Sequence, residues 1–273
     1  ICSGASYGNA GLLVPSHAVP LAAPGVVRKG IKWMFNPESP FYLKPRFDLD
    51  LLSWLWKFRG ACTKGHVHRA APLIRDLSLA SLALYEELDA IDGLDFGFQK
   101  KGLLTLCNSA RGLEELRHEV DTLRGIGLEA ALLTPEEAAE REPNVRLKIA
   151  GAAYYAQDAH LTPDLLVSGL ARHAASRGVE LRRDTEVLGC EITNGRVHTV
   201  STTRGDFVPR EVVLAGGAWS PGIASGLGVR LPIQPAKGYH ATFEMPARGP
   251  RTPLILMEAK VGVGPMLGKL RFA

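Results

Sequence analysis

Cysteine is scarce in this sequence, and the few cysteines lie far apart. The 273 residues include four of them, and no two form a C-x-x-C pair: Cys2, Cys62, Cys107 and Cys190. Structural disulfides and thiolate metal sites usually show short, regular spacings, so free thiols in a reducing compartment are the simplest interpretation. The sequence also lacks an apolar run of the roughly 18 to 20 residues that a transmembrane helix requires. These absences argue against a disulfide scaffold and against a membrane-spanning helix.

A strong excess of either charge is absent as well. The formal net charge is +4, from 32 basic and 28 acidic residues, and the isoelectric point is about 8.9. Basic and acidic residues are mixed, as between 111 and 119, which is typical of a solvated helix face rather than a nucleic-acid-binding stripe. We therefore expect no nucleic-acid partner. With 46% hydrophobic residues, the chain can build a sizeable globular core.

Clusters of metal-ligating or nucleophilic residues are missing too. His66 and His68 flank Val67, but no acidic residue or cysteine stands near them in the sequence. A metal site there is a weak alternative to two ordinary histidines. No serine, histidine and aspartate, and no cysteine and histidine, are arranged in a way that supports nucleophilic catalysis. We predict no metal site.

The residues that are present follow helix and strand patterns in turn. Apolar residues recur at helical spacing over 70–91 and over 113–123. Residues 134–137 (Thr-Pro-Glu-Glu) and 162–164 (Thr-Pro-Asp) each combine an N-cap residue, a proline at the first helical position and first-turn acids. Short strands are predicted at 102–107 and 151–155. This order predicts a mixed α+β protein.

Strand and turn signals follow the helix that begins near 163. Gly178 ends this helix, and residues 179–181 (Val-Glu-Leu) begin a strand. Three short strands are predicted between 184 and 214, with turns at Asn194-Gly195 and Arg204-Gly205. Residues 212–214 (Val-Val-Leu) read as a buried parallel strand that runs into 215–220 (Ala-Gly-Gly-Ala-Trp-Ser). Such an edge can receive a ligand, although an ordinary strand-to-helix turn is an equal alternative.

Two further segments have the composition of ligand-contacting loops. Residues 6–12 (Ser-Tyr-Gly-Asn-Ala-Gly-Leu) lack bulk, which suits a backbone lying against a planar ring system; the alternative is an ordinary turn. In residues 235–239 (Pro-Ala-Lys-Gly-Tyr), Lys237 supplies a positive charge and Tyr239 a hydroxyl, and both groups can bind a carboxylate. The alternative is a surface lysine and a tyrosine at the edge of the core. Neither segment is specific by itself.

These segments occur together and in order, and in this order the chain resembles the FAD-dependent D-amino-acid oxidase superfamily. Within it, the resemblance is strongest to the bacterial D-amino-acid dehydrogenases. The matching stretches span essentially the whole chain: Ser6-Tyr7-Gly8-Asn9-Ala10-Gly11, Ala22-Ala23-Pro24-Gly25-Val26, Lys32-Trp33-Met34, Asp158-Ala159-His160-Leu161-Thr162-Pro163, Ala215-Gly216-Gly217-Ala218-Trp219-Ser220, Pro235-Ala236-Lys237-Gly238-Tyr239 and Leu270-Arg271-Phe272-Ala273.

The resemblance implies an α+β, two-domain D-amino-acid-oxidase-like FAD fold, truncated at both ends. Residues 1–27 and 151–226 would belong to the FAD-binding domain, and residues 28–150 and 227–273 to the substrate-binding domain. The family opens with a strand, a G-x-G-x-x-G loop and a helix whose N-terminus holds the FAD pyrophosphate. That dinucleotide-binding unit is not in this sequence, so the chain alone is expected to lack FAD binding.

The resemblance also implies roles for individual residues. The expected cofactor contacts are Ser6, Asn9, Ala10, Gly11 and Leu12 beside the flavin, Val187 on the adenine side, and Ala215, Gly216, Gly217 and Trp219 near the cofactor. The expected catalytic residues face the substrate: Lys237, Tyr239 and His17. His17 would help to order the substrate pocket, with an exposed loop histidine as the alternative. Arg271 is a weak candidate for binding the substrate carboxylate and is expected on the sheet surface. His160 is expected to cap a helix.

The implied reaction is the oxidative deamination of a D-amino acid to a 2-oxo acid and ammonia, with the α-hydrogen passing as hydride to FAD. The alternatives are a glycine, sarcosine or proline-type amine oxidase on the same fold, and a non-catalytic fragment. The electron acceptor would be a membrane quinone or another electron-transfer acceptor. Segment 26–60 is rich in aromatic residues and lysines, and it is either an ordinary packed subdomain or a membrane-docking surface. The expected location is the cytoplasm, or the inner face of the cell membrane as a peripheral protein.

Overall fold

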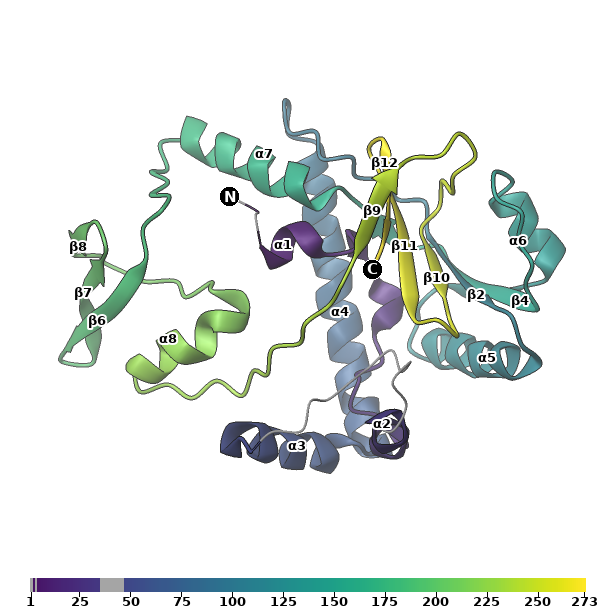
Figure 1. Ribbon diagram of the computed structural model, residues 1–273, viewed down its shortest axis with the longest axis horizontal. Helices are drawn as coiled ribbons and strands as arrows, with labels where there is room; N and C mark the ends of the chain where they lie inside the picture. Colours follow the sequence, from purple (N-terminus) through teal and green to yellow (C-terminus); the bar gives the residue numbers. More distant parts are fainter. Residues whose placement is uncertain (1, 3, 35–46) are drawn as a thin grey trace. The chain divides into compact units, whose positions relative to one another are not determined.

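The computed structural model describes residues 2, 4–34 and 47–273, which form two compact units (Figure 1). Unit 1 contains Ile1–Phe47, Lys57–Arg177 and Gly238–Ala273, and unit 2 contains Asp48–Trp56 and Gly178–Lys237. The two units are defined by how compactly their residues pack against one another. The functional division into an FAD-binding and a substrate-binding domain, with the bounds given above, stays a prediction.

Unit 1 is built around a seven-stranded mixed sheet. Its strand order is β3-β4-β2-β10-β11-β12-β9, in which β10 runs parallel to β2 and the other neighbours are antiparallel. The strands are β2 (Leu103–Cys107), β3 (Ala130–Leu133), β4 (Gly151–Tyr155), β9 (Ala241–Glu244), β10 (Leu254–Leu256), β11 (Val261–Met266) and β12 (Lys269–Phe272). The strands predicted at 102–107 and 151–155 are therefore confirmed.

Helices cover this sheet because their apolar faces match its two surfaces. α5 (Ala110–Gly125) buries Leu116, Val120 and Leu123 in one cluster with β2 and β4, while α6 (Pro135–Arg141) places Ala138 in a second cluster. The predicted N-cap of α6 is confirmed as a full capping box, in which Thr134 and Glu137 bond reciprocally. Further helices among the described residues before Arg177 are α1 (Ala5–Gly8), η1 (Pro15–His17), α2 (Val26–Met34), α3 (Leu49–Ala61), α4 (Lys64–Asp89) and α7 (Pro163–Ser176).

The start of α7 differs from the prediction. Thr162 stands at the N-cap, but its side chain caps no helix N–H; its Oγ1 accepts a hydrogen bond from the N–H of Leu267 at 3.3 Å. His160, expected to cap this helix, lies in β5 (Ala159–His160), which pairs with β1 (Leu12–Leu13). The side chain of Thr162 and the backbone of His160 bond to partners that are distant in sequence, which no local pattern reveals.

Unit 2 contains a three-stranded antiparallel sheet with the predicted turns. β6 (Val187–Thr193), β7 (Arg196–Thr202) and β8 (Gly205–Phe207) are joined in order. Asn194 and Gly195 both have positive φ, at 52° and 74°, as a tight two-residue hairpin turn requires. After this sheet come η2 (Gly217–Trp219) and α8 (Ser220–Gly226).

Two strands predicted for unit 2 are wrong. Residues 179–181 and 212–214 lie outside any strand, and the side chain of Val213 is 88% exposed. A strand forms only when another strand satisfies its backbone N–H and C=O groups. Within the described part of this unit, no strand pairs with either segment, so their apolar composition alone does not produce a strand.

A buried arginine of the sheet holds the N-terminal segment in place. Arg271 is 2% exposed, so its expected position on the sheet surface is wrong. Its Nε donates to Thr242 Oγ1 at 2.9 Å, and its Nη1 donates to the carbonyl oxygens of Asn9, at 2.8 Å, and Tyr7. The guanidinium also lies 5.0 Å from the centroid of the Tyr7 ring. Strands β9 and β12 are thereby bonded to residues 7–9.

A buried carboxylate fixes the next part of the same segment. Asp158 is fully buried, and its two oxygens accept hydrogen bonds from the N–H of Ser16, at 3.1 Å, and the Ser16 hydroxyl, at 2.5 Å. Burial raises the pKa of Asp158 to about 7, and the two bonds from Ser16 only partly oppose that rise. The contact positions η1, which contains His17.

The first prediction concerns Arg271. Replacing Arg271 with Met should lower the free energy of unfolding by about 3 kcal/mol or more, because buried carbonyl oxygens and a hydroxyl lose their donor. Urea unfolding followed by circular dichroism measures this change. Lys269→Met, at an exposed position of the same strand, is the control and should cost less than about 0.5 kcal/mol. Equal effects of the two substitutions would show that Arg271 does not hold the segment.

The second prediction concerns pH. The pKa of Asp158 is raised from 3.8 to about 7, so its protonation stabilises the folded state; this contribution is complete below about pH 4 and is lost as pH rises through about 7. Asp158→Asn keeps a neutral side chain at every pH. Relative to the parent, the variant should therefore gain roughly 2 to 4 kcal/mol between pH 4 and pH 8.

The measurement is the difference in unfolding free energy between variant and parent at each pH. Taking this difference is necessary because the pKa of His160 is lowered to about 4. The contribution of His160 to the unfolding free energy therefore rises with pH, opposite to that of Asp158, and it cancels in the difference. Asp121→Asn, at an exposed position of α5, is the control and should show a difference that does not vary with pH. A pH-independent difference for Asp158→Asn would contradict the assigned role.

Candidate functional site

The segment predicted to lie beside the flavin forms a tight, internally bonded loop. Asn9 donates from Nδ2 to the carbonyl of Ser6 at 2.8 Å and accepts from the N–H of Gly11 at 2.7 Å. Gly11 has φ +68°, and a Cβ there would lie 2.2 Å from the carbonyl oxygen of Leu161. Glycine is therefore required at this position by both conformation and space. Ala10 faces Gly264, and Leu12 continues into β1.

A large pocket opens directly after this loop. It has a volume of about 1250 Å³ and is lined by residues from three parts of unit 1: residues 16–26, helices α4 and α5 with the residues that follow α5, and the turn between β10 and β11. Ser16 and His17 stand at its start, and Lys260 contributes from the turn. The structure thus places one predicted catalytic residue, His17, in a pocket that also meets the sheet.

His17 is an exposed residue of this pocket lining. Desolvation by the neighbouring protein lowers the pKa of His17, and the nearby negative charge of Glu119 only partly opposes it. The imidazole is therefore neutral near pH 7 and can accept a proton. Glu119 itself accepts a hydrogen bond from the hydroxyl of Tyr155 at 2.6 Å.

The charge of the pocket lining is mainly positive. Lys64, Arg75 and Lys260 are lysine or arginine side chains of the lining, and Glu119 is its acidic residue. Arg75 is partly committed, because it donates to the carbonyl of Ile126 and pairs with Asp76 at 2.6 Å. The lining therefore favours an anionic ligand.

The other two predicted catalytic residues, Lys237 and Tyr239, are not among the residues that line this pocket. Tyr239 precedes β9, which begins at Ala241, and is 79% exposed. Lys237 belongs to unit 2, whereas Tyr239 belongs to unit 1. The residue that contacts the flavin-facing loop is their neighbour His240, whose ring lies 6.0 Å from that of Tyr7.

The remaining predicted cofactor contacts lie in unit 2. Val187 is the first residue of β6 and pairs with Thr202. Gly216 precedes η2, which contains Gly217 and Trp219. Gly217 has φ +55° with nothing within 4 Å of the position of a Cβ, and Trp219 is 69% exposed. This turn presents bare backbone beside an exposed indole, a surface that suits a flat ligand.

The residues present fit parts of FAD at two places. Residues 6–12 can hold the flavin ring by backbone contact, since the loop is rigid and lacks bulk. The turn at 215–219 can hold another part of the cofactor through the open backbone at Gly217. The first place belongs to unit 1 and the second to unit 2.

Sequence reasoning missed Arg271 and His240 as residues that position the site. The partners of Arg271 are 29 and more than 260 residues away in the sequence, so no local pattern could reveal them. His240 contacts Gly8, where a Cβ would lie 3.2 Å from the imidazole. The sequence signal that could have indicated these residues is the alternation of polar and apolar residues along the two paired strands, which places polar side chains on one face.

Within residues 2, 4–34 and 47–273, no helix is both long and apolar enough to cross a membrane.

Comparison with known proteins gives a consistent result. The family model described as FAD dependent oxidoreductase, DAO, matches residues 1–268. The D-amino acid dehydrogenase of Cereibacter sphaeroides is 34% identical over 247 residues, which cover 87% of this chain and 55% of that protein. The D-amino acid dehydrogenase of Rhizorhabdus wittichii is 29% identical, over 97% of this chain and 65% of that protein. The chain thus spans between about half and two thirds of the length of these curated relatives.

Solved structures show the same fold. Glycine oxidase from Geobacillus kaustophilus superposes with a TM-score of 0.68 and 26% identity, over 99% of this chain and 60% of that one. L-proline dehydrogenase from P. horikoshii gives a TM-score of 0.59 at 22% identity, over 71% of this chain and 53% of that one, and supports the fold alone. Taken with the family match over residues 1–268, these findings show that the chain belongs to the DAO family of FAD-dependent oxidoreductases.

Proposed function

We propose that the protein oxidises D-amino acids to 2-oxo acids and ammonia, with FAD as the hydride acceptor. The observation that carries the proposal is the pocket with His17, which follows the flavin-facing loop directly and has a mainly positive lining. D-amino acid dehydrogenases that are 30 to 34% identical to this chain support the substrate class. Because the chain covers only part of those relatives, the activity is proposed for the FAD-loaded holoenzyme.

The chemistry divides between cofactor and protein. FAD, when bound, supplies the acceptor for the α-hydrogen. Residues 6–12 would position the ring, and the pocket would hold the substrate against it. The neutral imidazole of His17 would take a proton from the substrate ammonium at a ring nitrogen, which frees the lone pair that the oxidation needs. Lys260 would attract the substrate carboxylate, with Lys237 and Tyr239 as further candidates for binding it.

A second candidate function is an amine oxidase of the glycine, sarcosine or proline type. The similarity to glycine oxidase over 99% of the chain favours it. The two functions differ in the substrate that reduces the flavin and in the acceptor that reoxidises it. A third alternative, a non-catalytic fragment, predicts no flavin reduction at all.

The third prediction tests the function and His17 together. In the FAD-loaded holoenzyme under anaerobic conditions, D-alanine should bleach the oxidised flavin absorbance, and L-alanine should not. His17→Gln should slow this reduction by roughly tenfold to hundredfold near pH 7 while the FAD content is unchanged. Raising the pH should restore part of the rate, because more of the amine then enters without its proton.

The control is His118→Gln, an exposed histidine that lines the same pocket and pairs with Glu114. It should reduce flavin at nearly the parent rate. Bleaching by glycine, sarcosine or proline but not by D-alanine would favour the second function. If no amino acid reduces the flavin, the proposed activity is wrong; if His17→Gln matches the parent at every pH, His17 is not the proton acceptor.

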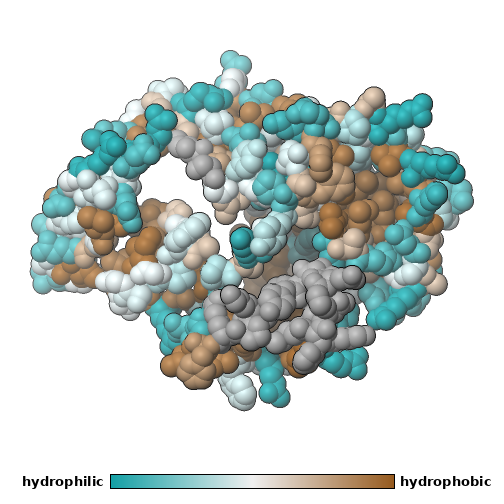
Figure 2. Space-filling model, in the orientation of Figure 1, coloured by the Kyte–Doolittle hydropathy of each residue, from teal (hydrophilic) through white to brown (hydrophobic). Residues whose placement is uncertain are grey.

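The proposed electron acceptor is a membrane quinone, and helix α3 supports membrane docking. Leu49, Leu52 and Trp56 are exposed at spacings of three and four residues, which places them on one face of the helix. Figure 2 shows apolar surface at the place of α3. Lys57 follows and is also exposed. An apolar face beside a lysine is the pattern that binds the interface of an anionic bilayer.

The fourth prediction separates docking from packing. The double variant Leu49→Ala/Trp56→Ala should bind anionic liposomes at least about tenfold more weakly, because it removes much of the inserting apolar surface. Turnover with a soluble dye acceptor should stay within twofold. The control Leu73→Ala/Leu77→Ala removes exposed leucines from α4 and should bind liposomes like the parent. No liposome binding by the parent, or equal loss in both variants, would rule out docking through α3.

A further inference from the structure

A second pocket lies in unit 1, at the other end of strand β11. The turn before β11 reaches the His17 pocket through Lys260, whereas the last residue of β11, Met266, and the turn after it, with Leu267, line this second pocket. The volume of the second pocket is about 260 Å³. Neither a predicted catalytic residue nor a predicted cofactor contact belongs to its lining. It is therefore separate from the site of the proposed reaction.

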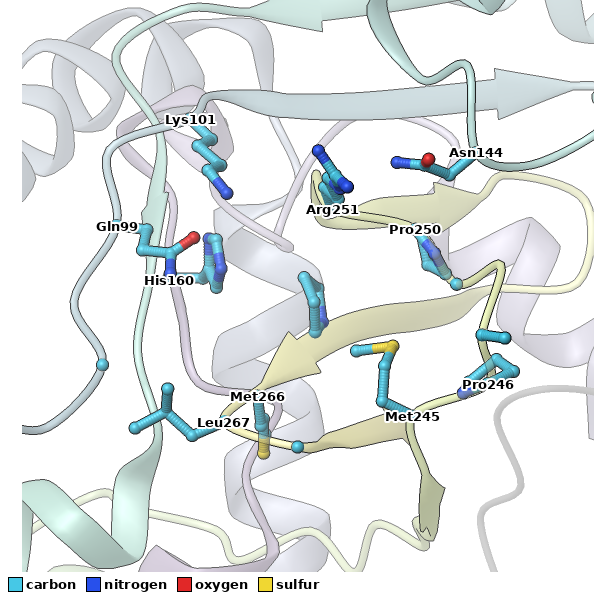
Figure 3. Close-up of a pocket in the computed structure, with 15 residues that line it drawn as sticks. Gln99, Lys101, Asn144, His160, Met245, Pro246, Pro250, Arg251, Met266 and Leu267 are labelled. Atoms are coloured by element: carbon cyan, nitrogen blue, oxygen red, sulfur yellow. The ribbon is translucent and has the colours of Figure 1, made fainter.

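Two cationic side chains share this pocket. Lys101 and Arg251 enter it from different segments, and Figure 3 shows both side chains at the same side of the cavity. The lining contains no aspartate or glutamate. Among the residues that the structure describes, neither side chain forms an ion pair, although the adjacent Lys100 pairs with Glu86 at 2.6 Å. Two unneutralised cations facing one cavity favour an anion.

A buried carboxylate fixes the backbone of the loop that carries Arg251. Glu142 is fully buried, and its Oε2 accepts the backbone N–H groups of Arg251 and Thr252, both at 2.8 Å. This carboxylate is occupied by the backbone and is not part of the pocket lining. The position of Arg251 is therefore set by the fold, while its guanidinium remains available to a ligand.

Neutral polar groups line the wall next to Lys101. Gln99 and His160 form an antiparallel bridge, with backbone hydrogen bonds of 2.9 and 3.0 Å, so their side chains lie on the same side (Figure 3). Lys101 follows Gln99 by two residues in an extended segment and therefore points the same way. His160 is 3% exposed, and its Nδ1 has no hydrogen-bond partner within the described residues.

An unpartnered buried nitrogen is uncommon in a folded protein and points to a missing partner. Burial first, and then the positive charge of Lys101, lower the pKa of His160 to about 4. The ring is thus neutral near pH 7, with one nitrogen that donates and one that accepts. The Nδ1 atom itself is enclosed by protein atoms, so His160 contributes a neutral polar wall to the pocket and not a second positive charge.

We propose that this pocket binds a small carboxylate, with Lys101 and Arg251 as its charge partners and His160 and Gln99 as hydrogen-bonding groups. The volume is below the roughly 300 to 1000 Å³ of pockets for drug-sized ligands, so the ligand is small. Met245, Met266 and Pro250 supply apolar walls beside the cations. An aliphatic carboxylate combines both features.

The carboxylate has two sources that share this chemistry. One is a free small acid, and the other is an aspartate or glutamate side chain of a polypeptide segment. Propionate represents the first source, and the blocked amino acid N-acetyl-glutamate amide represents the second. Sodium chloride at equal ionic strength is the reference for non-specific screening.

The experiment measures binding by isothermal titration calorimetry to the full chain at pH 7. Either carboxylate probe should bind saturably, and Lys101→Gln and Arg251→Gln should each weaken it by about tenfold or more. The controls are Lys100→Gln, beside Lys101 but paired with Glu86, and Arg248→Gln, in the same loop as Arg251 but outside the pocket lining. Both should bind within twofold of the parent.

The relative affinities of the two probes identify the source of the carboxylate, and a lack of binding would show that the site does not exist. Tighter binding of propionate indicates a free acid, and tighter binding of the blocked glutamate indicates a polypeptide. Absence of saturable binding for both probes, or equal binding by the parent and both pocket variants, would overturn the proposal. Lys101 and Arg251 are exposed, so circular dichroism should show that their variants remain folded. Flavin reduction plays no part in this measurement, so its result is independent of the proposed function.

Discussion

The guanidinium of Arg271 is the contact on which the geometry of unit 1 depends. A buried positive charge is costly unless its donors are satisfied, and here the acceptors are two backbone carbonyls and a threonine hydroxyl rather than a carboxylate. Those carbonyls belong to Tyr7 and Asn9, so the cost of burying the charge can be met only if residues 7–9 stay against the sheet. The start of the loop at residues 6–12, which is predicted to lie beside the flavin, is thereby held against strands β9 and β12.

The sheet of unit 1 contributes to two pockets whose histidines have different surroundings. β11 leads from the turn of Lys260, at the His17 pocket, to the turn of Leu267, at the smaller pocket. Each pocket contains a histidine whose pKa is lowered by desolvation, so both rings are neutral near pH 7. The difference lies in their surroundings: His17 faces an open cavity with an acidic neighbour, whereas His160 is enclosed and its charged neighbour is a lysine. These surroundings are the basis for the two proposed roles, a neutral proton acceptor at His17 and an anion site beside His160.

The parts of the fold that sequence predicts well are those in which cause and effect are close in the chain. The capping box at Thr134, the apolar stripe of α5 and the Asn194-Gly195 turn all depend on residues within one or two turns of structure. The strand expected at 212–214 failed because its formation depends on a partner strand, which composition does not supply. Arg271 was misplaced for a related reason: burial of a strand residue is decided by what packs on that face, here residues 7–9. For the site, resemblance supplied the order of the segments, and the structure supplied the pocket of His17.

The buried polar groups of unit 1 show where a ligand is most needed. Asp158 is satisfied by Ser16, Glu142 by the backbone of residues 251 and 252, Thr162 by Leu267 and Arg271 by residues 7, 9 and 242. In each case a buried polar side chain fixes a loop, so the desolvation cost is offset by a defined backbone position. His160 breaks this pattern, because its Nδ1 is buried without a partner inside the described chain. His160 therefore lines the smaller pocket as a neutral group, and the positive charge of that pocket comes from Lys101 and Arg251 alone.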